Sequence, residues 1–245
     1  MAQLPVKQSN VPIVMRCLWT GYDYLSESTN QDDYVVGGVV EFQLYQLPEP
    51  CKVIPKQWVI RNILTVEQRL KNIAFPEPSA INSSEAEVDL RFKLPDTVYM
   101  SEETEDIKMS VWDAERAGWF TEYIVQNKKL YNHQERTIRF PTRKFAPIAM
   151  LQSRITDFPY QSWKLRCTEE TRALLDLETK RLRLCLEITP MEMKLIDCDE
   201  PALAHLTNKE GLTPGYLLQE LTKCGILMMP RDEDAALAGI ELKDR

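Results

Sequence analysis

The sequence EVDLRFKLP, at residues 87–95, alternates apolar and charged side chains along most of its length. Successive side chains of a β-strand point to opposite faces, so this alternation predicts a strand with one buried face and one solvated face. The apolar face would hold Val88, Leu90, Phe92 and Leu94, and the charged face Asp89, Arg91 and Lys93. Such a strand is typical of an antiparallel sheet that covers a core on one side.

The same period of two recurs at residues 106–113 and 181–188. Further candidate strands occupy residues 12–18, 34–44, 57–64, 119–125, 137–140 and 148–152. These strands are short and are separated by turn residues rather than by amphipathic helices, which favours a sandwich over a parallel α/β sheet. We therefore predict a mainly β protein with an antiparallel β-sandwich over residues 11–155.

Turn signals divide the predicted sandwich. AERAG at residues 114–118 and YNHQE at residues 131–135 predict tight turns within a meander over residues 106–152. Polar loops are expected at residues 26–33, 75–87 and 101–106. Gly37 and Gly38, inside an apolar strand, favour a bulge or the close approach of another backbone. A phosphate cradle is the alternative, although no lysine, serine or helix start follows the pair.

The pattern changes after residue 160. Residues 171–177 and 181–188 predict a hairpin, and residues 192–196 predict a third strand. With the helix described next, they form a small α+β domain over residues 160–230. The rest, residues 231–245, is expected to be an acidic C-terminal tail.

One helix is well marked near the end of this domain. Thr213 can cap its N-terminus, Pro214 suits the first helical position, and Gly225 can close its C-terminus. The apolar stretch ILMMP, at residues 226–230, is expected to return as a last strand.

The stretch DFPYQSWKLR, at residues 157–166, lies where the sandwich should end and the α+β domain begin. We interpret it as a joint in which Phe158 and Trp163 pack on the two domains. On that interpretation, Trp163→Ala would cost about 3–5 kcal/mol of stability. A binding surface is the alternative for the same residues. Lys164 and Arg166 would alternate outward from the next strand.

The overall composition restricts the classes of partner. The 245-residue chain has a net charge of -7, which disfavours nonspecific binding to nucleic acid or to an anionic membrane. Its longest apolar runs fall short of the ~20 residues that a membrane span needs. No secretory signal pattern opens the sequence, and the six cysteines contain no CxxC pair, so we expect an intracellular, reduced protein. RTIRFPTRK, at residues 136–144, is expected to be the solvated face of a hairpin, with an anion site as the alternative.

Few residues are available for catalysis. The chain contains only two histidines, His133 and His205. A cysteine hydrolase would have to pair Cys198 or Cys224 with His205, and a packed or surface histidine is the alternative for His205. No nucleophile elbow, phosphate-binding loop, dinucleotide fingerprint or zinc motif is present in the sequence. We therefore expect a non-enzymatic protein with no catalytic, cofactor or metal site.

The five tryptophans are candidates either for the core or for partner binding. They are Trp19, Trp58, Trp112, Trp119 and Trp163. We expect each to fill the core or its end while its indole N–H reaches a backbone carbonyl. The alternative is that some of them anchor a protein interface.

Several longer strings together resemble one protein family. They are VMRCLWTGYDYLS, VVGGVVEFQLYQLPEP, VWDAERAGW, YNHQERTIRFPTRKFAPIAMLQ, FPYQSWKLR and LTPGYLLQELTKCGILMMP. In this order, from about residue 11 to residue 230, they resemble the Casc (cancer susceptibility candidate) family of proteins associated with ciliary axonemal inner-arm dynein. The family's long charged helical region before this part does not match here, and relatives continue beyond ILMMPRDED, so the resemblance implies a fragment or a short relative.

This resemblance implies a non-enzymatic structural or assembly subunit in motile cilia. Its partners would be axonemal dynein subunits and tubulin, and its location the cytoplasm and the ciliary axoneme. No interface residues can be carried over by position. The second hypothesis is a general cytoplasmic adaptor whose β-sandwich binds peptide or protein partners through an open sheet edge.

Overall fold

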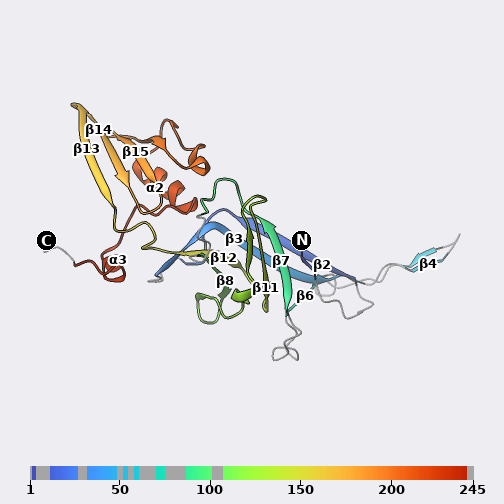
Figure 1. Ribbon diagram of the computed structural model, residues 1–245. Coiled ribbons are helices and arrows are strands. Elements are labelled where there is room, and N and C mark those ends of the chain that lie inside the picture. The colour runs from blue at the N-terminus through green and yellow to red at the C-terminus, as the bar shows by residue number, and fades with distance from the viewer. Residues whose placement is uncertain are drawn as a thin grey trace.

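The computed structural model describes residues 2–3, 12–26, 32–48, 52–54, 58–60, 70–75, 87–100 and 107–241. Its strands form antiparallel sheets, and its few helices lie toward the C-terminus (Figure 1). The predicted mainly β, antiparallel fold class is therefore confirmed. Residues 27–31, 76–86 and 101–106 of the expected loops lie outside the described part of the chain. So do residues 57 and 61–64 of the strand expected at 57–64.

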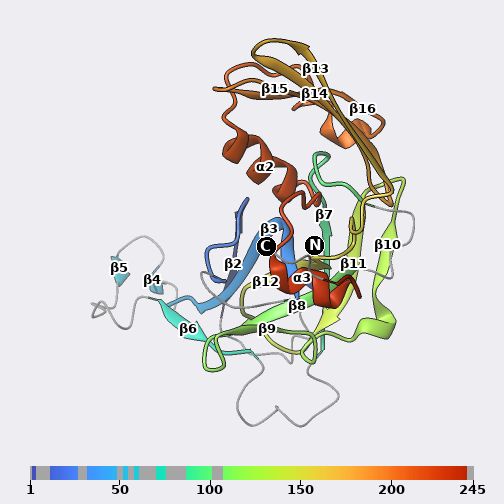
Figure 2. The same ribbon diagram turned by 90° about the vertical axis from the view of Figure 1, so that its left-hand side faces the viewer.

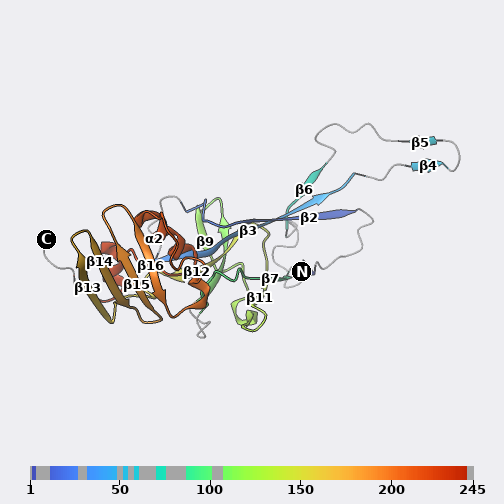
Figure 3. The ribbon, with the colours of Figure 1, turned by 90° about the horizontal axis from the view of Figure 1, so that it is seen from above.

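Two sheets build the N-terminal unit, which we call the sandwich. The first sheet has the order β1 (Ala2–Gln3), β7 (Val88–Lys93), β11 (Thr137–Thr142), β10 (Leu130–Asn132). The second has the order β2 (Ile13–Thr20), β3 (Asp33–Gln46), β12 (Ile148–Ser153), β8 (Ile107–Asp113), β9 (Gly118–Phe120), and β6 (Lys71–Ile73) also pairs with β3. A separate hairpin of β4 (Lys52–Ile54) and β5 (Trp58–Ile60) projects away from both sheets (Figure 3).

The core of the sandwich lies between the two sheets. Val88 and Leu90 of β7 are at most 1% exposed, and they share one apolar cluster with Met109 of β8 and Ile148 of β12. The charged residues between them remain at least partly exposed. The alternation in residues 87–95 is therefore confirmed, with Phe92 only partly buried at the margin of the core.

The glycine pair forms a bulge in β3. Ala149 pairs with Val39 and Met150 with Val36, so Gly37 and Gly38 are extra residues in the ladder. Gly38 has a φ of 90°, and a Cβ there would lie 2.1 Å from the carbonyl oxygen of Thr20. The expectation of a bulge with a close backbone approach is confirmed.

The expected meander is wrong as a single sheet. β8 and β9 belong to the second sheet, whereas β10 and β11 belong to the first. The strand expected at 119–125 ends at Phe120, and the 3-10 helix η3 (Gln126–Lys128) lies where the chain crosses between sheets. Crossing lets the apolar sides of both hairpins face the same core, which a flat meander would not do.

A third sheet forms the C-terminal unit, which we call the small unit together with its helices. Its order is β13 (Ser162–Glu169), β14 (Arg172–Glu178), β15 (Arg183–Ile188), β16 (Met193–Cys198). The predicted hairpin and third strand are confirmed. The 3-10 helix η4 (Pro201–Leu203) and α2 (Pro214–Lys223) cover one face of the sheet, and α2 lies between this sheet and the sandwich (Figure 2).

The caps of α2 agree with the sequence. The Thr213 hydroxyl accepts a hydrogen bond from the Tyr216 N–H at 3.4 Å, and Pro214 occupies the first turn. Leu217 and Leu221 are completely buried against the third sheet. Gly225 follows the helix with a φ of 93°. At ten residues, α2 is the longest helix in the described part of the chain, where no helix meets the length and apolarity needed to cross a membrane.

The strand expected at residues 226–230 is wrong. Ile226 is buried in the core of the small unit, and Leu227 is buried in the core of the sandwich. The carbonyls of Met228 and Met229 accept hydrogen bonds from the side chains of Tyr160 and Arg154. These two carbonyls therefore do not pair with a neighbouring strand. This segment therefore connects the two cores. Residues 231–245, expected to be an acidic C-terminal tail, include the short helix α3 (Asp232–Leu237).

The close approach at the bulge can be tested by comparing Gly38→Ala with Gly211→Ala as the control. Gly211 has a φ of 73°, and an added Cβ there would meet nothing within 4 Å. Gly211→Ala should therefore cost only the strain of a left-handed backbone, about 1–2 kcal/mol. Gly38→Ala should cost about 1–3 kcal/mol more, because the added methyl group overlaps the Thr20 carbonyl. Urea unfolding of both variants gives the difference, and equal losses would contradict the close approach.

Candidate functional site

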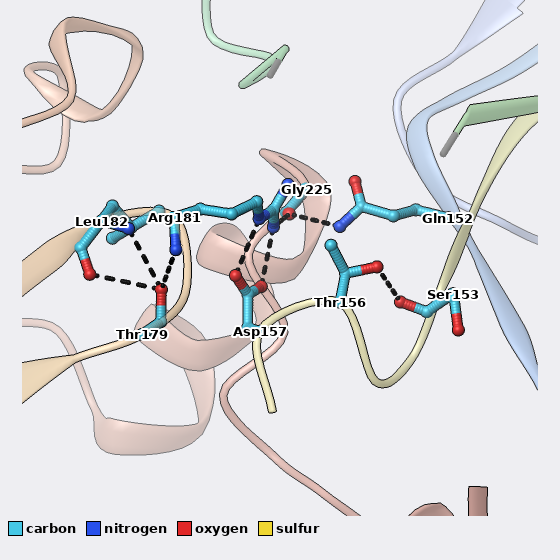
Figure 4. Close-up of polar contacts among 8 residues, drawn as sticks. All are labelled: Gln152, Ser153, Thr156, Asp157, Thr179, Arg181, Leu182 and Gly225. Atoms are coloured by element: carbon cyan, nitrogen blue, oxygen red, sulfur yellow. Dashed lines mark hydrogen bonds and ion pairs between the residues drawn. The ribbon is translucent and has the colours of Figure 1, made fainter. Parts of the chain in front are cut away.

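The candidate site is the junction between the sandwich and the small unit. After β12 ends at Ser153, the chain turns at once: the Thr156 N–H and hydroxyl donate to the Ser153 carbonyl at 3.2 and 2.7 Å. The Phe158 N–H donates to the Ile155 carbonyl at 3.0 Å, and the Phe158–Pro159 peptide bond is cis. This compact turn places Asp157 beside the small unit (Figure 4).

Asp157 forms a two-pronged ion pair with Arg181. The Arg181 guanidinium donates to the two carboxylate oxygens at 2.8 and 2.7 Å, and Asp157 is only 1% exposed. Arg181 is aimed by its own turn, in which the Thr179 hydroxyl accepts the N–H groups of Arg181 and Leu182 at 3.1 Å. The guanidinium also lies 4.8 Å from the ring centre of Tyr99. Burial opposes the charge on Arg181, but the Asp157 hydrogen bonds and charge outweigh it and raise the Arg181 pKa.

A single carbonyl, that of Gly225, joins both units at the end of α2. It accepts a hydrogen bond from Arg181 at 2.8 Å and another from the Gln152 amide of β12 at 3.3 Å (Figure 4). A Cβ at Gly225 would lie 3.1 Å from the Val36 side chain. Glycine therefore supplies both the left-handed backbone and the close approach to β3.

A second buried ion pair connects Arg154, the residue after β12, to α3. Arg154 donates to the Asp234 carboxylate at 2.9 and 3.1 Å, and the two side chains are 9% and 5% exposed. The Asp234 carboxylate also accepts the Arg231 N–H at 2.7 Å. Burial would raise the pKa of Asp234, but the hydrogen bonds from Arg154 and the Arg231 N–H outweigh it and lower that pKa.

Two tyrosines complete the junction. Burial, and then the negative charge of Asp157, raise the pKa of Tyr160 to about 12, and its hydroxyl donates to the Met228 carbonyl at 3.3 Å. Burial and Asp157 also raise the pKa of Tyr34. Both phenols are protonated at neutral pH. The carboxylates of Asp157 and Asp234 are each paired with an arginine. Chemically, the junction is suited to fixing the two units in one orientation rather than to moving protons.

The residues of the hydrolase hypothesis are only partly brought together. His205 Nε2 lies 3.9 Å from Cys224 Sγ, and His205 Nδ1 lies 3.0 Å from the Ala202 carbonyl. However, burial raises the pKa of the Cys224 thiol to about 11, so it is neutral at pH 7. Burial does the same for Cys198, whose pKa is also about 11. His133 lies apart, exposed in the turn after β10.

The cations of residues 136–144 pair with acids of neighbouring segments. Arg139 and Arg143 contact Asp89 and Glu87, and Lys144 contacts Asp113. Hydrogen bonds from Lys128 and Arg143 lower the pKa of Glu87. These contacts favour the hairpin-face interpretation over an anion site. Among the residues described, no group of three or more histidine, cysteine or acidic side chains is arranged to hold a metal ion.

Some tryptophans pack in the core, as expected, and others are exposed, as a partner interface would require. Trp112 and Trp119 pack edge to face with ring centres 5.3 Å apart, and the Trp119 indole donates to the Ser26 hydroxyl at 2.7 Å rather than to a carbonyl. Trp19 is 57% exposed, although its indole donates to the Gly37 carbonyl at 3.0 Å. The side chain of Trp58 lies outside the described part of the structure.

The expected packing of Trp163 at the joint is wrong. Phe158 is 6% exposed and belongs to the sandwich core, as expected, but Trp163 is 69% exposed. Trp163 lies on β13, the outermost strand of the third sheet, where α2 does not reach. The burial on which the large cost of Trp163→Ala depended is absent, and the surface alternative for this residue is favoured.

An open groove of about 560 Å³ runs beside the junction, between α2 and the start of β3. Its lining includes Tyr22, Tyr34, Arg154 and Gln219. The sequence indicated a joint at residues 157–166, but it did not reveal Arg154, Arg181 or Asp234 as ion-pair residues of the junction. The one available signal was the charge of Asp157 and Arg181 beside apolar segments, which does not identify a partner across more than twenty residues.

Breaking the first ion pair should be costly. Asp157→Ala leaves Arg181 buried without its carboxylate, so we expect a loss of about 3–5 kcal/mol in urea unfolding. Glu178→Ala is the matched control, because it removes the carboxylate that pairs with the largely exposed Arg183 and should cost far less. Similar losses for both variants would show that the junction pair does not stabilise the fold.

The second pair predicts a pH dependence. The folded-state pKa of Asp234 is lowered, so its contribution is complete above the unfolded-state pKa of about 3.9 and is lost as the pH falls through the folded value. Asp234→Asn should therefore be less stable than the natural protein at pH 7, with the gap narrowing below about pH 4. Urea midpoints from pH 7 to 2 test this, with Glu233→Gln on the same helix as control. A gap independent of pH would contradict it.

Comparison with known proteins gives relatives of one kind. No family model matches the chain. Dynein axonemal intermediate chain 7 of Bos taurus is 27% identical over 202 residues, which cover 80% of this chain and 27% of the relative. The Homo sapiens protein of the same name is 26% identical over the same extent. The Danio rerio protein is 24% identical over 222 residues, 85% of this chain and 29% of the relative.

The extent of the similarity is as informative as its level. A match to 80% of the chain is longer than the sandwich or the small unit alone, so it includes parts of both. The chain spans less than a third of the length of these relatives. The chain is therefore related in sequence, at low identity, to proteins named dynein axonemal intermediate chain 7.

Proposed function

We propose that the chain is a non-enzymatic structural or assembly subunit that associates with axonemal inner-arm dynein and microtubules in motile cilia. The observation that carries the proposal is the similarity to dynein axonemal intermediate chain 7 across both structural units. The resemblance of residues 11–230 to the Casc family supplies the inner-arm assignment. The protein would act in the cytoplasm during assembly, in the finished axoneme, or in both.

The structure supports this proposal through its junction. Arg181 and Arg154 each join the sandwich to the C-terminal part of the chain by a buried, multiply bonded ion pair. Two surfaces held at a fixed spacing suit a subunit that positions partners relative to one another. The raised pKa values of Cys198 and Cys224 also support a role without nucleophilic chemistry.

Affinity purification tests the proposal. The tagged protein would be expressed in cells with motile cilia and recovered from cytoplasm and from detergent-extracted axonemes. We expect inner-arm dynein subunits and tubulin to be enriched over an untagged control, with outer-arm subunits enriched less. Absence from axonemes together with no dynein or tubulin subunit above the control would overturn the proposal.

Fractionation separates the two roles within the proposal. A resident subunit should stay with detergent-extracted axonemes and leave them with the dynein arms in high salt. An assembly factor should bind dynein subunits only in the cytoplasmic fraction.

A general cytoplasmic adaptor is the second candidate. It is favoured by β13, whose outer edge pairs with no other strand in the described part of the chain. Stable protein partners in cells that make no motile cilia, without dynein subunits among them, would support this candidate over the first.

A further inference from the structure

The outer strand of the small unit presents an unusual surface. Within the described residues, β13 pairs only with β14, and all eight of its residues are exposed. It forms the outer margin of the third sheet (Figures 1 and 3). An edge strand of this length offers a row of backbone N–H and C=O groups to another chain.

One face of β13 continues the core of the small unit. Trp163 and Leu165 pair with Leu177 and Leu175 of β14, so they lie on the face that α2 covers farther along the sheet. The helix packs on β16 and on β3 of the sandwich. Trp163 and Leu165 consequently remain 69% and 54% exposed. Both are large apolar side chains on a face that a further strand would extend.

The opposite face of β13 carries two cations, which have Asp176 of β14 as their acidic neighbour. Lys164 and Arg166 alternate with the apolar pair, and Arg166 contacts Asp176 of β14 at 2.6 Å. Cations on an edge strand discourage uncontrolled pairing with other edges. They also select the charge of any strand that does pair, because like charges directly opposite are destabilising and opposite charges are favourable.

These charges argue against a second copy of this chain paired around the centre of β13. Antiparallel pairing of β13 with itself around Leu165 would place Lys164 opposite Arg166, and pairing around either cation would place it opposite itself. A strand with acidic residues at those positions would instead match both faces. We propose that β13 is a strand-addition site for a partner polypeptide in which acidic and apolar residues alternate.

The partner strand would add to the free edge of the third sheet. Its apolar side chains would cover Trp163 and Leu165, and its carboxylates would lie opposite Lys164 and Arg166. Backbone hydrogen bonds would supply affinity that is independent of sequence, and the two faces would supply selectivity. This inference goes beyond the proposed function, since it specifies the partner's pattern but not its origin.

Peptide binding to the full chain tests the proposal. The probes are two fluorescent nine-residue peptides, one alternating Val and Glu and one alternating Val and Lys, measured by anisotropy. We expect the Val/Glu peptide to bind at least tenfold more tightly than the Val/Lys peptide. Equal affinities, or no binding of the Val/Glu peptide, would overturn the proposal.

Variants locate the site. Trp163→Ser should weaken Val/Glu peptide binding at least tenfold, and Lys164→Gln with Arg166→Gln should abolish the preference between peptides. Met191→Ser is the matched control, because Met191 is 79% exposed in the turn before β16. All of these side chains are exposed, so circular dichroism should show an unchanged fold. An equal effect of Met191→Ser would show nonspecific apolar binding and overturn the proposal.

Hydrogen exchange distinguishes strand addition from peptide binding through side chains alone. Amides of β13 that face the free edge should exchange more slowly when the Val/Glu peptide is bound, whereas amides of β16 should be unaffected. Binding without slower exchange in β13 would overturn the strand-addition geometry. Failure of these tests alongside recovery of dynein subunits would leave the proposed function standing.

Discussion

The buried pair of Arg181 and Asp157 is the constraint on which the arrangement of the molecule depends. Asp157 is presented by a tight turn after β12, and Arg181 by the turn between β14 and β15. Neither charge would be tolerated at this depth without the other. Because the partners come from the sandwich and the small unit, the two units are matched by charge as well as by apolar contact.

Local patterns were sufficient to predict most individual elements. The alternation around Val88 and Leu90, and the caps at Thr213 and Pro214, depend on neighbours within a few residues, so they could be predicted from the sequence. The sheet to which a strand belongs is a long-range property. Nothing near Tyr131 indicates that β10 joins the first sheet while β9 joins the second.

The joint at residues 157–166 could be predicted, but the long-range contacts that form the candidate site could not, for the same reason. Residues 226–230 look like a strand, but their carbonyls are taken by Arg154 and Tyr160, about seventy positions earlier. The exposure of Trp163 depends on how far α2 extends across the third sheet, which its own strand pattern does not contain. The sequence comparisons, in contrast, pointed to axonemal proteins without any site residue being identified.

The carbonyl of Gly225 has a consequence for how this chain can vary. It ends α2 and at the same time receives donors from Arg181 and Gln152. Each residue added to a helix turns its end by about 100° and advances it by about 1.5 Å. A one-residue insertion in α2 would therefore turn this carbonyl away from both donors. The contacts of the Gly225 carbonyl therefore fix the length of α2. Insertions and deletions among related chains should fall in loops rather than in this helix.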